Sequence, residues 1–212
     1  MAWVKPQYSK ARVDWAGEIL CCSLRSQSSN LEAYFNANLE YETATDIVNN
    51  WRAVHSYPLQ AMKMTLKRRA KRIYTTAIVA QRLKRQASIK LKLKLSKETG
   101  HHPHLSQMQD IGGCRAVMET VSQVRRLERT FEEACKKNPH RGPQYFKTSD
   151  YIASPKENGY RSVHLVYKFR SISPEHSCYN GQRIEIQLRS RPQLSTIRQP
   201  RWRHIRPLAE KH

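Results

Sequence analysis

Apolar and polar side chains alternate in the run from Ile184 to Arg189, and this run constrains the fold more than any other stretch. Alternation with a period of two predicts a β-strand that buries one of its faces. The residues expected to point inward are Ile184, Ile186 and Leu188, and those expected on the opposite face are Glu185, Gln187 and Arg189. A carboxylate, an amide and a cation on one strand face are typical of ordinary surface, but they also suit a reaction site.

A second set of functional groups precedes this strand. The segment from Asp150 to His164 contains the run Pro155-Lys156-Glu157-Asn158-Gly159-Tyr160. It offers a cation, a glycine that permits unusual backbone conformations, and an aromatic ring that can stack on a planar base. Together with the carboxylate of Glu185, these groups indicate a nucleotide site.

The net charge of the chain is strongly positive. Its 212 residues include 38 Lys and Arg against 17 Asp and Glu, which gives a formal charge of +21 and a pI of about 10.1. Such an excess describes partners and solubility rather than fold. It predicts a polyanionic partner, either nucleotide phosphates or RNA, and a basic surface that is merely solvated is the alternative.

Cysteine usage and hydropathy predict where the protein works. The five cysteines are odd in number and have no Cys-x-x-Cys spacing, and the sequence shows neither an apolar leader nor a long apolar run. These features predict a reduced, cytoplasmic protein with no membrane partner.

Three helices and a strand are expected before the first chemical motif. The first helix begins at Ser9, the second covers Leu39 to His55, and the third begins near Pro58 and runs towards Ile73. The β-branched run from Ile73 to Val79 then predicts a strand. The helices are expected to flank the sheet to which this strand belongs.

A basic segment follows the expected strand. A helix from Ala87 is preferred to a further strand, because Ser88 and Lys92 then lie one turn apart on the same helical face. Arg82 and Lys84 share one face of the strand end, so that four groups can converge on phosphates. A basic amphipathic surface segment is the alternative.

Asp110 stands at the mouth of a further expected strand, which runs from Met108 to Met118 and contains Gly112 and Gly113. Glycines at this place permit the close approach of backbone or phosphate. A lone Asp at a strand end is usually a cap. If Asp110 lies opposite Glu185, however, the pair supplies two hard oxygen ligands suited to Mg2+ that holds a triphosphate.

The remaining elements complete a mixed pattern of helices and strands. Expected in order are a helix from Thr120 to Lys137, a loop over residues 138–149, a strand from Val163 to Phe169, and an Asn-Gly hairpin turn at Asn180. The apolar residues expected on the inner face of the helix are Val121, Val124, Leu127 and Phe131.

Four motifs follow one another between residues 82 and 189. They are Arg82-x-Lys84-x3-Ser88-x3-Lys92, then Asp110-Ile-x-Gly-Cys-Arg115, then Asp150-Tyr151-Ile-x2-Pro155-Lys156-x-Asn158-Gly159-Tyr160-Arg161-Ser162-x-His164, and then Glu185-Ile-Gln187-Leu-Arg189. In this order they resemble the synthetase domain of the RelA/SpoT family, whose members make the alarmones ppGpp and pppGpp. No metal motif of a hydrolase domain precedes them, so the chain looks like a small stand-alone synthetase.

This resemblance implies an α+β fold, with a nucleotidyltransferase-like mixed β-sheet flanked by helices and preceded by an N-terminal helical segment. The expected division is a helical segment over residues 1–72, a synthetase domain over residues 73–190, and an atypical basic tail over residues 191–212. The implied reaction moves the β,γ-diphosphate of ATP to the 3′-hydroxyl of GTP or GDP, with AMP leaving, as in the stringent response.

The resemblance also implies a role for each motif residue. The groups implied to hold the ATP phosphates are Arg82, Lys84, Ser88 and Lys92, with support from Arg115. Asp110 would bind Mg2+, and Glu185 would share the metal and act as base on the 3′-hydroxyl. Tyr160 would stack on the guanine, and the residues implied to surround the acceptor are Lys156, Asn158, His164 and Gln187. Purely structural roles for Lys156 and His164 are the alternative.

The sequence departs from the family pattern after Arg189. Residues 190–203 are rich in Pro and Arg and lack the apolar face of the closing helix that the family pattern implies. We hypothesise a frameshifted truncation whose last twenty or so residues are non-native to the fold, and sequencing the gene across this region tests it. The tail also adds positive charge, which inflates the net charge as an indicator of RNA binding.

Two further functions stay open at this point. One is that of a toxic relative in the same family, which diphosphorylates the 3′ end of tRNA and blocks translation. The other is an inactive, truncated remnant with basic RNA-binding character. The sequence does not choose between GDP, GTP and tRNA as acceptor, nor between a monomer, a homo-oligomer and a complex with an antitoxin partner.

Overall fold

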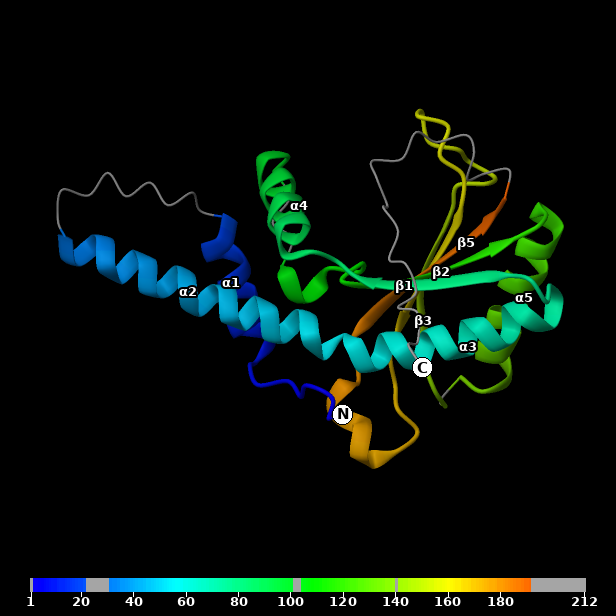
Figure 1. Ribbon diagram of the computed structural model, residues 1–212, viewed down its shortest axis with the longest axis horizontal. Helices are drawn as coiled ribbons and strands as arrows, with labels where there is room; N and C mark the ends of the chain where they lie inside the picture. Colours follow the sequence, from blue (N-terminus) through cyan, green and yellow to red (C-terminus); the bar gives the residue numbers. More distant parts are fainter. Residues whose placement is uncertain (1, 22–30, 101–103, 140, 192–212) are drawn as a thin grey trace, which may run out of the picture.

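The computed structural model describes residues 2–21, 31–100, 104–139 and 141–191 (Figure 1). The elements, in order, are α1 (Lys10–Cys21), α2 (Leu31–Val54), α3 (Ser56–Ile73), β1 (Ile78–Leu83), α4 (Gln86–Glu98), η1 (Leu105–Gln107), β2 (Gly112–Met118), α5 (Val121–Lys137), β3 (Gln144–Asp150), β4 (Val163–Lys168), η2 (Pro174–Tyr179) and β5 (Arg183–Ser190). In the part of the chain described, no helix has the length and apolar character needed to cross a membrane. The predicted α+β fold, with its mixed sheet and N-terminal helices, is confirmed.

The sheet has five strands in the order β1-β2-β5-β4-β3. β5 lies at its centre, parallel to β2 and antiparallel to β4, and the two outer pairs are antiparallel. The chain forms α5, β3 and β4 before it returns to the centre, so the last described strand is inserted between earlier ones. This insertion brings the alternating run of residues 184–189 against two other strands.

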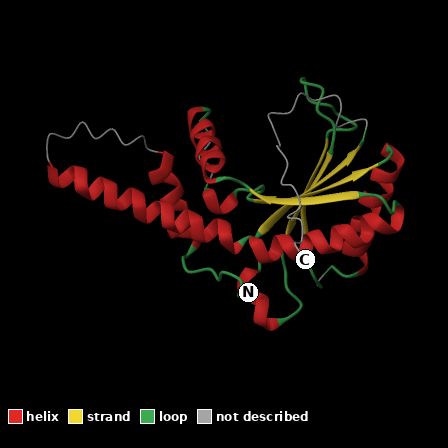
Figure 2. Cartoon of the chain, viewed as in Figure 1, coloured by secondary structure: helices red, strands yellow, loops and turns green. Residues whose placement is uncertain are grey.

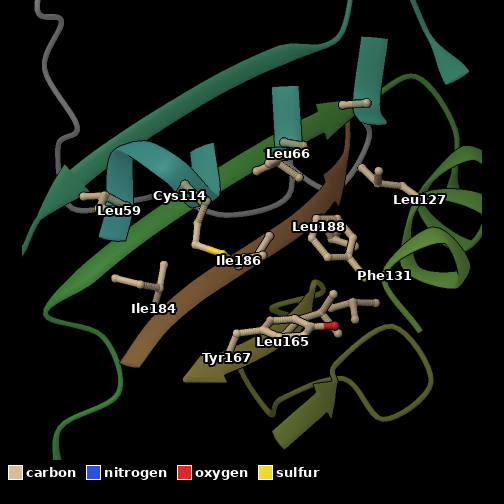
Figure 3. Packing of buried hydrophobic residues seen from close by; sticks show 14 of the residues in the cluster. Leu59, Leu66, Cys114, Leu127, Phe131, Leu165, Tyr167, Ile184, Ile186 and Leu188 are labelled. Atoms are coloured by element: carbon tan, nitrogen blue, oxygen red, sulfur yellow. The ribbon is translucent and has the colours of Figure 1, made fainter. Parts of the chain in front are cut away.

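One face of the sheet is covered by α3 and α5 (Figure 3). The side chains of Ile184, Ile186 and Leu188 point into this layer and are all 0% exposed, which confirms the predicted inward face. They pack with Leu66 of α3 and Phe131 of α5 in one continuous core. Full burial of each such aliphatic side chain stabilises the fold by about 1.5–3 kcal/mol.

A second core lies beside the sheet, among α1, α2, α4 and η1. Figure 2 shows these helices as a group at one end of the molecule, joined to the sheet by the nearly continuous α2 and α3. Ile89 and Leu93 of α4 are buried in this second core, whereas α3 packs on the sheet. Both cores therefore draw on segments from each side of residue 72, and the expected domain boundary there stays a prediction.

The predicted strand from Ile73 to Val79 is wrong. α3 continues to Ile73, a turn follows in which the Ala77 amide donates to the carbonyl of Tyr74 at 3.0 Å, and β1 begins only at Ile78. The physical reason is that Ile73 continues the apolar face of α3, which packs on the sheet, so that tertiary burial outweighs the β-branched preference.

Several other expected boundaries also differ. The loop expected over residues 138–149 contains β3, an edge strand without the alternation that would have marked it. The strand expected from Met108 begins at Gly112, since residues 105–107 form a 3-10 turn. The turn at Gly181 is present with a φ of 87°, but it closes a longer loop that contains η2 rather than a tight hairpin.

The helix expected from Thr120 to Lys137 is confirmed as α5, with one side chain misplaced. The hydroxyl of Thr120 accepts a hydrogen bond from the Gln123 amide at 3.2 Å, and the side-chain oxygen of Gln123 accepts one from the Thr120 amide at 3.3 Å, so that the two residues form a capping box. Val124, Leu127 and Phe131 are buried as predicted. Val121 is 41% exposed instead, because it lies in the first turn, beyond the edge of the core.

Candidate functional site

The face of the sheet opposite α3 and α5 carries the polar residues of the motifs. Glu185 of β5 pairs with Gly113 of β2, and Gln187 pairs with both Arg115 of β2 and His164 of β4. Side chains of paired residues point to the same face of a sheet. The strand register therefore gathers residues from three of the four motifs, and the alternation predicted for Glu185 and Gln187 is confirmed.

Glu185 is held by two neighbours. Its Oε1 lies 2.8 Å from Nδ1 of His164, and its Oε2 accepts a hydrogen bond from Nε2 of Gln187 at 2.7 Å. Burial raises the pKa of Glu185, but the hydrogen bond and charge of His164 and the hydrogen bond from Gln187 outweigh it and leave the pKa below its ordinary value. The side chain is therefore an ionised carboxylate near neutral pH.

His164 links this carboxylate to an aromatic ring. Its Nε2 lies 2.7 Å from the hydroxyl of Tyr160. An ionised carboxylate only accepts hydrogen bonds, so Nδ1 of His164 donates to Glu185, while Nε2 of the same ring is bonded to the Tyr160 hydroxyl. This chain of bonds fixes the orientation of both rings relative to Glu185.

Asp110 lies just before β2 and is bound by two lysines. Lys84 Nζ is 3.0 Å from one carboxylate oxygen, and Lys92 Nζ is 2.9 Å from the other. Burial raises the pKa of Asp110, but the charge and hydrogen bond of Lys92, followed by those of Lys84, bring it below the ordinary value. The negative charge of Asp110 in turn raises the pKa of Glu185, so the two carboxylates lie within electrostatic range of each other.

A pocket of about 420 Å³ opens beside the two lysines. The residues that line it are Lys84, Ser88, Leu91, Lys92, Leu95, Ser96 and Thr99, most of them on α4. The helix predicted from Ala87 is confirmed, and it places Ser88 and Lys92 on the pocket side. No side chain caps the first turn of α4, where the Ser88 amide donates to the carbonyl of Arg85 at 2.9 Å.

Arg82 and Arg115 complete the positive surroundings of the two carboxylates. Burial lowers the pKa of Arg82, while Asp110 and Glu185 act in the opposite direction, which places this guanidinium near both carboxylates. Burial and repulsion from Arg189 lower the pKa of Arg115. The structure thus brings together Lys84, Ser88 and Lys92 in one pocket and places Arg82 near both carboxylates, whereas Arg115 lies near Arg82, Arg189 and Tyr160 and does not line the pocket.

The loop between β3 and β4 carries the residues predicted for the acceptor side. The Asn158 side chain accepts from the Tyr160 amide at 3.1 Å, and Gly159 has a φ of 74°, so both residues shape the turn. Lys156 Nζ lies 4.6 Å from the ring centroid of Tyr151 and 5.6 Å from that of Tyr160. Lys156 and Tyr160 face one another. The side-chain oxygen of Asn158, in contrast, is bonded to the backbone of the loop itself.

Two residues of this region belong to the motifs but were given no role by the resemblance. Arg189 is 3% exposed, and its guanidinium carbon lies 4.4 Å from the ring centroid of Tyr160. Its Nε and Nη1 atoms have no hydrogen-bond partner among the described residues. The sequence signal that could have identified Arg189 is its position in the alternating run, on the same strand face as Glu185 and Gln187. Tyr151 contacts the rings of Tyr160 and His164 edge-on. Nothing in its sequence position indicated this packing, since it depends on how the loop folds back.

The two carboxylates are a donor set that fits a magnesium ion. In the described part of the chain, no group of three or more His, Cys, Asp or Glu side chains is placed to hold a metal. Mg2+ usually needs only one or two carboxylates together with substrate phosphates and water. Asp110 and Glu185 meet that requirement, and the nearby lysines and arginines suit the phosphates.

Comparisons with known proteins identify the family and the fold. Residues 81–198 match the family region described as "Region found in RelA / SpoT proteins". The fold is similar to that of the small alarmone synthetase 1 from Bacillus subtilis bound to its product pppGpp, with a TM-score of 0.54, 24% identity, and coverage of 68% of this chain and 73% of that one. It is also similar to small alarmone synthetase 2 from Bacillus subtilis, with a TM-score of 0.56, 22% identity, and coverage of 70% and 74%. No curated protein sequence matches the chain.

Proposed function

This chain belongs to the RelA/SpoT family, and on that premise we propose that it transfers the β,γ-diphosphate of ATP to the 3′-hydroxyl of GDP or GTP. The observation that carries the proposal is the ionised Glu185, which His164 links to the Tyr160 hydroxyl and which lies near Asp110 and Arg82. In the reaction, the 3′-oxygen attacks the β-phosphorus of ATP. The bond from that phosphorus to the oxygen of the α-phosphate breaks, AMP leaves, and the hydroxyl proton passes to a base.

Glu185 is the base in this proposal. A ribose hydroxyl is a weak nucleophile, and a positioned base assists it by about 10²–10⁴-fold. Both oxygens of Glu185 are oriented by hydrogen bonds, from His164 and Gln187, yet each has a lone pair left to accept a proton. His164 positions the carboxylate, and its bond to the Tyr160 hydroxyl ties that position to the acceptor side.

The donor side holds the triphosphate of ATP. Phosphoryl-type transfer depends on charge neutralisation and in-line placement more than on covalent chemistry. Lys84, Ser88 and Lys92 share one pocket, and Arg82 lies near both carboxylates. In the structure the two lysines bind Asp110. We expect them to turn to the phosphates when the nucleotide binds, with Arg115 in support.

Asp110 and Glu185 would hold a magnesium ion. Bound there together with ATP, the ion would neutralise phosphate charge. Chelation with EDTA is expected to stop transfer, and added Mg2+ to restore it. Transfer that persists at full rate in EDTA would contradict this assignment.

The acceptor nucleotide is expected to stack on Tyr160. The Arg189 guanidinium carbon lies 4.4 Å from the centroid of that ring and supports one of its faces. Lys156 Nζ lies 5.6 Å from the same centroid, so its charge can bind the phosphates of a nucleotide that stacks on the ring. Gln187 of β5 pairs with His164, and Asn158 shapes the loop that carries Tyr160. A nucleotide with a free 3′-hydroxyl can thus lie between the ring and Glu185.

The test is transfer of label from γ-labelled ATP in the presence of Mg2+, with GDP, GTP and bulk tRNA offered separately. Label on GDP or GTP is the expected result. Glu185→Gln keeps the shape of the side chain but removes the base, and is expected to lower kcat at least about 10²-fold. Glu132→Gln, which removes an exposed carboxylate of α5, is the matched control and should keep the activity of the unaltered protein.

A second candidate is diphosphate transfer to the 3′ end of tRNA, and the formal charge of +21 favours it. The same experiment separates the two, because label would then appear on tRNA and not on the free nucleotides. Absence of transfer to any acceptor would contradict both and point to an inactive chain. That outcome would also agree with the hypothesis of a frameshifted tail, whose residues beyond 191 lie outside the described structure.

A further inference from the structure

α3 carries an uninterrupted set of positive charges. The helix runs from Ser56 to Ile73 and contains no Asp or Glu. Four of its cations are exposed, namely Lys67, Arg68, Lys71 and Arg72. We call these four residues the α3 ridge. Exposed helix faces usually mix charges of both signs at a spacing of three or four residues, so this composition is unusual for surface that is only solvated.

The ridge faces away from the sheet. The residues of α3 that pack on the strands are Leu59, Met62, Leu66 and Ala70, and all of them are buried. At 100° per residue, the ridge occupies the opposite side of the helix. Figure 3 shows Leu59 and Leu66 directed at the sheet. Glu185 belongs to the other face, because it alternates with the buried Ile184 and Ile186. The ridge is therefore separated from the candidate site by both the helix and the sheet.

The ridge charges are not neutralised within the described part of the chain. None of the four residues forms an ion pair there, and Lys71 Nζ donates to the backbone carbonyl of Thr75. Burial lowers the pKa of the neighbouring Arg69, and repulsion from Arg68 and Arg72 lowers it further. Cations in the last turn are favoured by the helix dipole, which explains Lys71 and Arg72 but not Lys67 and Arg68.

We propose that the α3 ridge is a docking surface for the phosphate backbone of a nucleic acid, separate from the catalytic site and beyond the proposed transferase function. Lys67 and Lys71 lie one turn apart, about 6 Å along the helix axis, and each has an arginine beside it. Long cationic side chains at this spacing can contact successive phosphates of one strand. Arginine adds forked hydrogen bonds to phosphate oxygens that lysine lacks.

A lipid surface fits the ridge less well. A helix that lies on a membrane needs an exposed apolar face beside its cations. On α3 that face is taken up by the core, and Met64 is its one exposed large hydrophobic residue. An acidic protein partner is also disfavoured, because stable protein interfaces use apolar or aromatic anchors that the ridge does not offer.

The test is equilibrium binding of single-stranded RNA and DNA of equal length, each blocked at its 3′ end so that neither can act as an acceptor. The ridge variant carries Lys67→Gln, Arg68→Gln, Lys71→Gln and Arg72→Gln; glutamine has nearly the helix propensity of lysine and arginine. The control variant loses the same charge at four other exposed lysines, through Lys94→Gln, Lys97→Gln, Lys136→Gln and Lys137→Gln. A third variant, Arg68→Lys with Arg72→Lys, keeps the charge.

The unaltered protein is expected to bind the RNA, the DNA or both, and the tighter one identifies the natural partner. We expect the ridge variant to bind at least about tenfold more weakly, with a slope of log K against log salt that is shallower by about 3, since each phosphate contact contributes about 0.7 for single strands. The control variant should lose less than half of that effect, and the charge-keeping variant should retain binding. Added GDP with a non-hydrolysable ATP analogue should not displace the nucleic acid.

Three results would overturn the proposal. Equal losses in the ridge and control variants would mean that binding follows net charge alone. Ridge-dependent binding to polyglutamate or to vesicles of anionic lipid that is as tight as binding to RNA would mean a different partner. Displacement by the nucleotides would place the nucleic acid in the catalytic site. Because the binding assay needs no catalysis, its outcome is distinct from that of the labelled-ATP experiment.

Discussion

A buried histidine makes the stability of this fold depend on pH. His55 joins α2 to α3 and is 1% exposed, and its Nδ1 donates to the carbonyl of Trp51 at 2.8 Å. Burial lowers the pKa of His55 from 6.5 to about 4, and the bond to Trp51 opposes this only in part. The unfolded chain therefore binds a proton at a pH at which the folded chain does not, so that acid favours unfolding between these two pKa values.

The size of this effect follows from the two pKa values. The contribution of His55 to the free energy of unfolding is fully present above the pKa of the unfolded chain. It falls as the pH drops below 6.5, and it stops falling when the folded His55 protonates near pH 4. Each pKa unit corresponds to about 1.4 kcal/mol, so the full contribution is about 3 kcal/mol. About 2 kcal/mol of it should disappear between pH 7.5 and pH 5, before most carboxylates begin to protonate.

The assay is urea denaturation at several pH values, for the unaltered protein and for His55→Phe. Phenylalanine keeps an aromatic ring against Trp51 but cannot titrate, so the variant should lack the loss of about 2 kcal/mol. It should carry a constant penalty, on the order of 1 kcal/mol, for the lost bond to the Trp51 carbonyl. His104→Gln, at an exposed histidine, is the control and should keep the pH dependence. Parallel curves for the unaltered protein and His55→Phe would refute the reasoning.

Four further predictions concern single residues of the sheet and its surroundings. Ile186→Ala should cost about 2–5 kcal/mol of unfolding free energy, because the side chain is 0% exposed and leaves a cavity, and a loss below 1 kcal/mol in urea would contradict this packing. Gly112→Ala should cost about 1–3 kcal/mol of unfolding free energy, since a Cβ there would lie 2.8 Å from Ile184 Cδ1. Gly113→Ala should be nearly neutral, because its Cβ would lie 3.9 Å from the nearest atom, and equal melting temperatures for these two variants would argue against the register. Thr120→Ala should lose about 1 kcal/mol through the missing helix cap, and Thr120→Ser should recover most of it in the same thermal melt. His164→Gln should lower kcat for diphosphate transfer on the order of tenfold with little change in the KM for ATP, and a rise in that KM alone would place His164 on the donor side instead.

Much of the site could be predicted from the sequence because its residues occur in strict local patterns. Alternation along β5 was enough to separate the inward Ile186 from the outward Glu185, and helical spacing was enough to place Ser88 and Lys92 on one face. These patterns follow from backbone geometry, which repeats every two residues in a strand and every 3.6 in a helix. Four such patterns in one order also indicated the family that residues 81–198 confirm.

Element boundaries were less predictable, because competing local preferences are decided by packing. Ile73 has a β-branched side chain within a β-branched run, yet it ends a helix because its neighbours on α3 are buried against the sheet. β3 carries little apolar alternation and is a strand because β4 offers it a partner along the sheet edge. In both cases the favourable energy comes from contacts with residues that lie far away in the sequence.

The sequence by itself determined the elements of the central sheet face, the groups available for chemistry and the excess of positive charge. Only the tertiary structure decided that β5 is inserted between β2 and β4, which places Glu185 beside His164 and near Asp110. Only the tertiary structure placed Arg189 over the Tyr160 ring and turned the α3 ridge to the side away from the site. The physical reason is that a local pattern specifies which face of an element is buried, whereas the choice of neighbour depends on how all the buried faces pack together in one core.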